Sequence, residues 1–370
     1  MLRLLKRMVK SQLFFGLVCL VLVLIMNTIV FAVKMHQNFF RIELFDNNTL
    51  QGPIMDILLF APEIVILAMG MTLVASVSAG ADISVGSVMV LSAAVGIRVV
   101  GWNQPARMKA VYEYDAPLIL FFVLCLVIGA LCGAWNGFLV SKLKVQPMVA
   151  TLILLIAARA GSKVVMGNAQ VPVFVDNFKW AGNYIFGEGN KAIIPIPTQI
   201  FIAAAVVALT WLVLRYTALG KDIQSVGVNA RASRIMGLKP TRIIWFVFIF
   251  AGVCSGIAGL IAASRLAYID SRFTGNLIEL DVILAVALGG NSLAGGKFSL
   301  MGSVIGALTI QSLKTGLITI GVGRQTLPFY QAIVVVIIVV LQSTELRPMV
   351  KRATTRLRRS APAKKVEVLS

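Results

Sequence analysis

Long apolar segments follow one another along most of this chain, and they restrict the folds that it can adopt. A helix needs about 20 mainly apolar residues to cross a lipid bilayer, because each residue adds about 1.5 Å to its length. The strands of a membrane barrel would alternate apolar and polar residues, and these segments do not. We therefore predict an all-α integral membrane protein with about ten transmembrane helices. The predicted helices are Leu13–Val33, Ile54–Val77, Ser84–Val100, Pro117–Val140, Pro147–Met166, Thr198–Tyr216, Ile243–Ala263, Leu277–Gly290, Phe298–Ile320 and Leu327–Leu341.

The composition agrees with a membrane protein. Of the 370 residues, 58% are hydrophobic and 13% are charged, whereas soluble domains are about 45–50% apolar and about 25% charged. The net charge of +19 could indicate a nucleic-acid-binding protein. The basic residues instead cluster in alternate loops, which is the usual orientation signal of a membrane protein. We expect a lipid bilayer, and no nucleic acid, as a partner.

Loop charges also predict the orientation. Basic residues gather before the first helix, at Lys142 and Lys144, in the segment Thr217–Thr241 and in the C-terminal tail. Because cytoplasmic loops carry an excess of Lys and Arg, both termini are predicted to be cytoplasmic. The expected organisation is a cytoplasmic N-terminus at 1–10, one transmembrane domain at 11–345 and a basic cytoplasmic tail at 346–370. The first helix is expected to stay attached, since its apolar run is too long for a signal peptide.

The sequence lacks the groups that an enzyme or a metal site needs. His36 is the only histidine, and the four cysteines all lie inside apolar segments, where they serve as small packing residues. The stretch Gly295–Ser299 misses the first glycine of a phosphate-binding loop and has Phe298 after its lysine. We therefore expect no catalytic residue, no metal site and no cofactor bound by this chain.

The segment Thr217–Thr241 is a polar island between two apolar helices. It is predicted to contain a short amphipathic helix, because Asn229 can cap its start, Ala232 lies on an apolar face and Gly237 can stop it. Two interpretations stay open at this point. The segment is either a solvated basic connector or a lever on which a cytoplasmic partner acts.

Two Gly-rich breaks interrupt the apolar segments, at Ala79–Ser87 and at Leu288–Lys297. Each is followed by a helix rich in small residues, so the pair is predicted to form two Gly-broken helical hairpins in a parallel repeat. The helix Leu277–Gly290 is too short to cross the bilayer, which would place the second break at membrane depth. Paired breaks of this kind indicate the substrate path of a transporter. The alternative is that the glycines only allow close packing of helices.

Polar residues in or near the apolar segments are candidates for the substrate path, because such groups usually face a cavity or a partner. Asp82 also suits the N-cap of the helix that follows it. Arg159 is expected to pair with an internal acid or with backbone carbonyls. No buried run of acids resembles a proton or sodium relay. The candidate path residues are Asp82, Ser84, Asn136, Arg159, Asn291 and Ser292.

The predicted external loop Gly167–Pro197 is rich in aromatic residues. These side chains either lie at the membrane interface or form a docking surface for an external partner. The aromatic residues are Phe174, Phe178, Trp180, Tyr184 and Phe186.

With these stretches in order, the chain resembles a permease subunit of a bacterial ABC importer of the ribose/galactose/xylose type. The resemblance covers roughly residues 54–341. It departs from the family pattern at Ala79, Ala81, Ala160 and Lys221. The sequence Ser78–Asp82 and the long external loops resemble those of importers of furanoses and simple sugars. The motifs that carry the resemblance are Ala79–Ser87, Asn136-Gly137, Pro147–Leu152, Arg159-Ala160, Gly220–Leu238 and Leu288–Gly296.

This resemblance implies a membrane-spanning permease that forms the path for a small solute, expected to be a monosaccharide, in the bacterial inner membrane. It also implies a second permease copy, cytoplasmic ATP-binding subunits that use ATP and Mg, and an external solute-binding protein. The segment 217–241 would then be the cytoplasmic coupling segment. A permease for nucleosides or branched-chain amino acids, or an ion-coupled transporter working alone, are the alternatives. The residues implied in coupling are Gly220, Gly227, Asn229, Ala232, Arg234 and Gly237.

Overall fold

The computed structural model describes residues 12–34, 36, 38–100, 117–168, 170, 172–173, 176–185, 192–323 and 325–342. The predicted cytoplasmic ends at 1–10 and 346–370 lie outside the described residues. The chain divides into two compact units, Met1–Gly321 and Val322–Ser370. Everything below except α13 concerns the first unit.

The described part of the chain is mostly helical. Its helices are α2 (Gln12–Lys34), α3 (Pro53–Ser78), α4 (Val85–Val100), α5 (Leu118–Ser141), α6 (Pro147–Met166), α7 (Thr198–Tyr216), α8 (Leu219–Val228), α9 (Ala230–Ile235), α10 (Pro240–Leu266), α11 (Ile278–Leu288), α12 (Leu300–Thr319) and α13 (Leu327–Gln342), with the 3-10 helix η1 (Asp176–Ala181). The strands β1 (Glu43–Leu44) and β2 (Leu50–Gln51) form a short antiparallel pair. Each predicted apolar segment corresponds to one helix, with ends that agree within a few residues. Proline at the first turn fixes the start of α3, α6 and α10.

Six of the described helices are long and apolar enough to cross a membrane: α2, α3, α5, α6, α7 and α10. α4 and α13 have 16 residues each, and α11 has 11. An 11-residue helix is about 17 Å long, which is too short for a hydrocarbon core of about 30 Å. The helix before the second break is therefore short, as predicted. The number of ten crossing helices stays a prediction.

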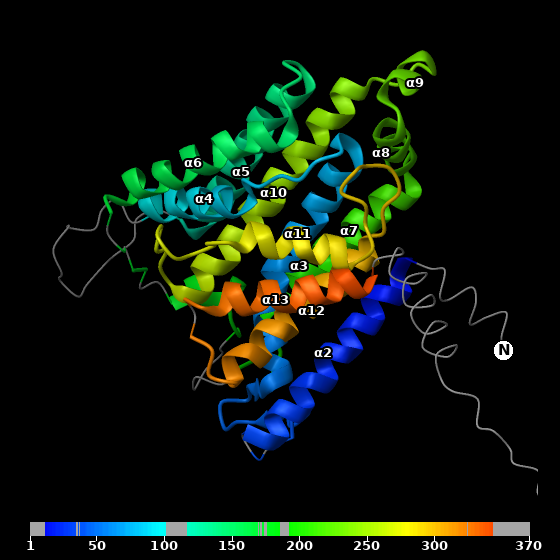
Figure 1. The fold of residues 1–370 in the computed structure, drawn as a ribbon. Coiled ribbons are helices and arrows are strands. Elements are labelled where there is room, and N and C mark those ends of the chain that lie inside the picture. Colours follow the sequence, from blue (N-terminus) through cyan, green and yellow to red (C-terminus); the bar gives the residue numbers. More distant parts are fainter. Residues whose placement is uncertain are drawn as a thin grey trace, which may run out of the picture. The chain divides into compact units, whose positions relative to one another are not determined.

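α3 lies at the centre of the first unit, in contact with α10, α12, α11 and α7 (Figure 1). All of its residues from Ala61 to Val77 are buried, which explains why the segment is apolar on every face. α10 packs most extensively against α5, and α2 packs against α12. Peripheral helices expose large apolar side chains such as Ile29, Ile156 and Leu209. In a membrane protein such faces contact lipid rather than water.

If both termini are cytoplasmic, the loops after the first, fifth and seventh predicted helices lie outside the membrane, and these three loops meet at one end of the helices. The β1–β2 hairpin joins the loop before α7, since Ala192 donates its N–H to the Asn47 carbonyl (2.8 Å) and Leu50 donates to Pro195 (3.2 Å). Val173, in the loop after α6, donates to the carbonyl of Ala267 after α10 (2.7 Å). Loops far apart in sequence but predicted on the same side are therefore adjacent in the structure.

Two aromatic residues of the loop after α6 pack against α5. Phe178 is fully buried, with its ring centroid 4.8 Å from that of Phe121. Trp180 lies 5.5 Å from Phe122. Phe174 and Phe186 lie outside the described residues. Phe178 and Trp180 thus cover the start of α5, whereas the Tyr184 hydroxyl donates to the Leu50 carbonyl (2.6 Å).

The two Gly-rich breaks differ in how their helices pack. α11 packs against α12, so the second break closes a helical hairpin. α4 packs mainly against α5, α6 and α10, and not side by side with α3 (Figure 1). The hydrogen bonds of the first break, described below, direct α4 towards α5 and α6. Two equivalent hairpins are therefore not confirmed, and the parallel repeat stays a hypothesis.

Candidate translocation path and coupling segment

The first break is held by a buried network that joins three of the candidate path residues. The Asp82 carboxylate accepts hydrogen bonds from the backbone N–H (2.9 Å) and the hydroxyl (2.6 Å) of Ser84. Asn136 of α5 donates its side-chain N–H to the Ser84 hydroxyl (3.0 Å). All three side chains are buried. The network ties the start of α4 to α5.

The helix cap lies two residues later than predicted. α4 begins at Val85, and the Ser84 carbonyl accepts the N–H of Val88 (2.9 Å), which makes Ser84 the N-cap residue. Asp82 instead fixes the turn before the cap, in an Asx-turn arrangement. The neighbouring Ile83 donates its N–H to Thr151 of α6 (3.2 Å). Side chains of α5 and α6 thus hold the break on two sides.

The second break is held by Asn291. Its side-chain N–H₂ donates to the Ser303 hydroxyl (2.8 Å) and to the Ser299 carbonyl (3.1 Å), while its oxygen accepts the Ser299 N–H. Ser303 of α12 also shares a hydrogen bond with Thr72 of α3. Ser292 is exposed and its hydroxyl accepts the N–H of Ala294 (3.1 Å), so it only shapes the turn. Asn291 and Ser292 are consecutive but do not belong to one network.

Arg159 forms a third, separate polar site. From α6 its guanidinium donates to the backbone carbonyls of Thr274 (2.8 Å) and Gly275 (3.0 Å), in the loop before α11. The buried carboxylate of Glu279 adds an attractive charge nearby. Of the two expected kinds of partner, an internal acid or backbone carbonyls, Arg159 therefore hydrogen-bonds to the carbonyls. It shares none of these hydrogen bonds with Asp82 or with Asn291.

Asp270 holds the loop that Arg159 contacts. Its backbone carbonyl accepts the N–H of Thr274 (2.9 Å), and its carboxylate accepts the N–H of Arg272 (2.9 Å) and the side-chain N–H of Gln170. Burial alone would raise the pKa of Asp270, but the hydrogen bonds from Arg272 and Gln170 outweigh it and lower the pKa below its ordinary value. The loop is therefore fixed by an ionised carboxylate at neutral pH.

Two buried ion pairs were not predicted. Glu63 of α3 pairs with Arg265 of α10 (2.6 Å), and Asp281 of α11 pairs with Lys314 of α12. Glu63, Asp281 and Lys314 lie inside predicted apolar segments, but helix packing alone decides which of them meet. Arg265 was missed because it lies just past the predicted end of its helix.

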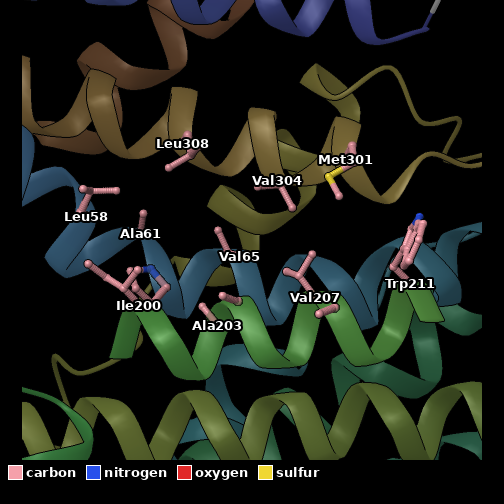
Figure 2. Close-up of a pocket in the computed structure, with 13 residues that line it drawn as sticks. Leu58, Ala61, Val65, Ile200, Ala203, Val207, Trp211, Met301, Val304 and Leu308 are labelled. Atoms are coloured by element: carbon pink, nitrogen blue, oxygen red, sulfur yellow. The ribbon is translucent and has the colours of Figure 1, made fainter. Parts of the chain in front are cut away.

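An apolar groove lies between α3, α7 and α12, with a volume of about 500 Å³. Figure 2 shows side chains such as Val65, Val207 and Val304 pointing into it. The only polar side-chain atom among its lining residues is the indole nitrogen of Trp211. None of the candidate path residues lines this groove. A solute that carries many hydroxyl groups would therefore leave most of them without partners there.

The segment 217–241 contains two helices rather than one. Asn229 ends α8 and caps α9, since its side-chain oxygen accepts the N–H groups of Arg231 and Ala232, both at 3.0 Å. Gly237 follows α9 with a left-handed φ of +86°, as expected of a helix stop. The N-cap and the stop are confirmed. α8 was not predicted; it forms because Ile223 and Val226 bury one face of an otherwise polar stretch.

The candidate coupling residues fall into a buried set and an exposed set. Gly220 and Gly227 pack against neighbouring backbone, where a Cβ on either would overlap a carbonyl oxygen, of Leu214 and of Ser76 respectively. Ala232 and Arg234 of α9 are exposed. They lie beside the apolar residues Ile235, which is 88% exposed, and Met236, which is 69% exposed. The structure thus buries one face of α8 and leaves most of α9 exposed.

Comparison with known proteins gives a consistent result. Residues 54–342 match the family described as branched-chain amino acid transport system / permease component. The chain is 36% identical over 340 residues to the galactofuranose transporter permease protein YtfT of Escherichia coli (strain K12), covering 92% of each chain. It is 35% identical over 350 residues to the fructose import permease protein FruF of Bifidobacterium longum (strain NCC 2705), covering 92% of this chain and 90% of that protein.

A third relative, the ribose import permease protein RbsC of Escherichia coli (strain K12), is 35% identical over 280 residues, covering 75% of this chain and 79% of that protein. No solved structure matches the chain. The motifs that suggested a sugar-import permease are therefore supported by similarity along nearly the whole sequence. The chain belongs to the family described as branched-chain amino acid transport system / permease component, and it is a membrane transport subunit rather than an enzyme.

Proposed function

We propose that this chain is the membrane-spanning permease subunit of an ATP-driven importer in the bacterial inner membrane, and that it forms the path for a monosaccharide. The observation that carries this proposal is the similarity over 92% of the chain to relatives whose names give galactofuranose and fructose as their solutes. ATP and Mg are used by a partner ATPase, and this chain binds no cofactor itself.

The polar groups near the two breaks support an uncharged, hydroxyl-rich solute. Ser84, Asn136, Thr72, Ser303 and Asn291 offer hydroxyls and amides rather than positive charges. Such groups both donate and accept hydrogen bonds, as sugar hydroxyls require. In the structure these groups hydrogen-bond to one another. A solute can therefore pass only after the breaks open, and such opening is a step of alternating access in a transporter.

We further propose that α9 receives the ATPase partner. Ile235 and Met236 are large apolar side chains that stand in an otherwise basic, exposed turn with Arg234 and Lys239. A small cluster of exposed apolar side chains surrounded by charged residues is typical of a protein-docking surface. In this proposal α8 transmits the movement of α9 to the membrane helices. A second permease copy and an external solute-binding protein complete the importer.

The test is uptake of labelled galactofuranose, fructose and ribose by right-side-out membrane vesicles that contain the chain, supplied with periplasmic extract. Vesicles are loaded either with ATP or with a non-hydrolysable ATP analogue. We expect uptake of at least one sugar to be at least tenfold higher with ATP, and to be absent from vesicles that lack the chain. An ionophore should leave this uptake unchanged.

Two other results would replace the proposal. Uptake that persists with the ATP analogue and stops with the ionophore would make the chain an ion-coupled transporter. The family description raises the second possibility, that the solute is a branched-chain amino acid. ATP-dependent uptake of labelled leucine, with no uptake of the three sugars, would establish that solute instead.

Replacing Gly237 by Val should reduce ATP-dependent uptake at least fivefold without lowering the amount of protein in the membrane. The left-handed φ of +86° is costly for a β-branched residue, while no atom lies within 4 Å of the added Cβ, so the strain falls on the turn after α9 and not on the core. Gly237→Asn is the matched control, because Asn tolerates this conformation and should restore most of the uptake. Loss of the Val variant from the membrane would contradict a coupling role and make the turn structural.

A further inference from the structure

The coupling segment and the second Gly-rich break meet at the end of α3, just before the first break begins. Ser76 of α3 is buried, and its carbonyl accepts the N–H of Gly296 in the second break (2.9 Å). Its hydroxyl donates to the Gly296 carbonyl, so the two residues are joined in both directions. Three residues after Ser76, the first break begins at Ala79 in a left-handed conformation.

α8 packs directly onto this pair. Gly227 lies so close that a Cβ there would overlap the Ser76 carbonyl oxygen and come within 2.9 Å of the Gly296 nitrogen. From the other side, a Cβ on Gly295 would lie 3.0 Å from the Gly227 carbonyl oxygen and 3.5 Å from the Ala79 Cβ. The contacts of Gly227 with Ser76, Gly295 and Gly296 are backbone to backbone.

We propose that Ser76 is the positioning residue through which α8 controls both breaks. Ser76, Ala79, Gly227, Gly295 and Gly296 form what we call the Ser76 junction. Closely packed backbone is nearly incompressible, so a displacement of α8 is passed on rather than absorbed. The second break moves through the two Ser76–Gly296 hydrogen bonds, and the first moves because Ala79 continues directly from α3. This inference rests on the coupling role proposed above for the segment 217–241.

A second observation fits the same assignment. Immediately before the junction, Met71 and Thr72 of α3 contact one break each: the Met71 sulfur accepts the N–H of Asp82 (3.3 Å), and Thr72 shares a hydrogen bond with Ser303 beside Asn291. A displacement of this end of α3 therefore reaches both polar networks. α3 is therefore the helix that contacts α8 and the polar networks of both breaks.

The first test replaces Gly227 by Ala. The added methyl group must push α8 away from Ser76, so we expect the amount of solute taken up per ATP hydrolysed to fall at least fivefold, while the ATPase subunit still co-purifies with the chain. A residue with only a structural role would change the amount of protein and not this ratio. Gly161→Ala in α6 is the control, because its Cβ would meet only Leu91 at 3.6 Å, an ordinary contact.

Ser76→Ala is the second variant, in case Gly227→Ala does not fold. It removes the hydroxyl bond to Gly296 but adds no atom, so the ratio of uptake to hydrolysis should fall at least twofold. If both variants fold and keep the wild-type ratio, the junction does not transmit movement. If the ATPase no longer co-purifies with Gly227→Ala, that residue acts in docking, and the proposal is likewise overturned.

A tether tests whether the junction moves as one body. The Cβ–Cβ distance of 3.5 Å expected between residues 79 and 295 is within the range of a disulfide. The left-handed φ of +93° at Gly295 strains a Cys there in both redox states, so the double variant Ala79→Cys/Gly295→Cys is compared with itself in its oxidised and reduced forms. Oxidation should leave at least half of the reduced form's uptake. A lower value means that the breaks separate during transport, which overturns the proposal. Wild-type uptake that does not need ATP would instead reject the proposed function itself.

Discussion

Replacing Lys314 by Met is expected to lower the free energy of unfolding by about 3 kcal/mol, because it leaves the buried carboxylate of Asp281 without its ammonium partner. The two side chains connect α12 to the first turn of α11, and they are only 21% and 7% exposed. Removing the ammonium takes away an attraction that offsets the desolvation cost of the Asp281 carboxylate. SDS titration of the purified protein in mixed micelles measures the change.

The double variant Lys314→Met/Asp281→Leu separates the loss of the pair from the loss of Lys314 itself. It removes both charges, so we expect it to recover most of the stability. Lys221→Met provides the control, since Lys221 is exposed on α8 and its replacement should leave the unfolding free energy unchanged. Equal losses in the single and double variants would show that Lys314 stabilises through its packing alone.

Replacing Gly252 by Ala is expected to cost about 2 kcal/mol or more of unfolding free energy, through overpacking. Gly252 of α10 and Gly129 of α5 face each other, and a Cβ on either would overlap the carbonyl oxygen of the other. The two helices must therefore separate along the most extensive helix contact in the first unit. Small residues at such crossings allow the backbone contact that holds membrane helices together.

The matched control for this variant is again Gly161→Ala. Both glycines lie inside helices, so Ala should improve the intrinsic helix propensity of each by up to about 1 kcal/mol. Only Gly252 meets backbone atoms of another helix. The same SDS titration should therefore show a loss for Gly252→Ala and none for Gly161→Ala. If both variants are as stable as the wild type, the close approach of α5 and α10 is not needed for stability.

The positions of the helices could be predicted because an apolar run of 20 residues must pair its own backbone N–H and C=O groups inside a bilayer. A helix does so and has the length that the bilayer thickness requires. Pro147–Met166 and Thr198–Tyr216 agree with α6 and α7 to the residue. The caps at Asn229 and Gly237 were predictable for a similar reason, since capping depends on a residue and its close neighbours in sequence. α8 was not predicted because its apolar face is only two buried positions in a polar stretch.

The candidate path residues show the limit of this reasoning. The sequence suggested six of them as one set, and the structure separates them into the Asp82 network, the Asn291 network, the Arg159 site and an exposed turn at Ser292. Hydrogen bonds between Asn136 and Ser84, or between Thr72 and Ser303, join helices far apart in the chain. Such pairings depend on helix rotation and register, which hydropathy does not encode.

By itself, the sequence determined that this protein is a helical membrane protein, where its long apolar helices lie to within a few residues, and which segments are broken by glycine. These properties follow from local composition and from the thickness of a bilayer. Only the tertiary structure decided that Gly227, Ser76 and Gly296 meet and that Lys314 pairs with Asp281. It also decided that α4 packs against α5 and α6 rather than side by side with α3. Contacts of this kind arise from the simultaneous packing of several helices, and no stretch of sequence contains them alone.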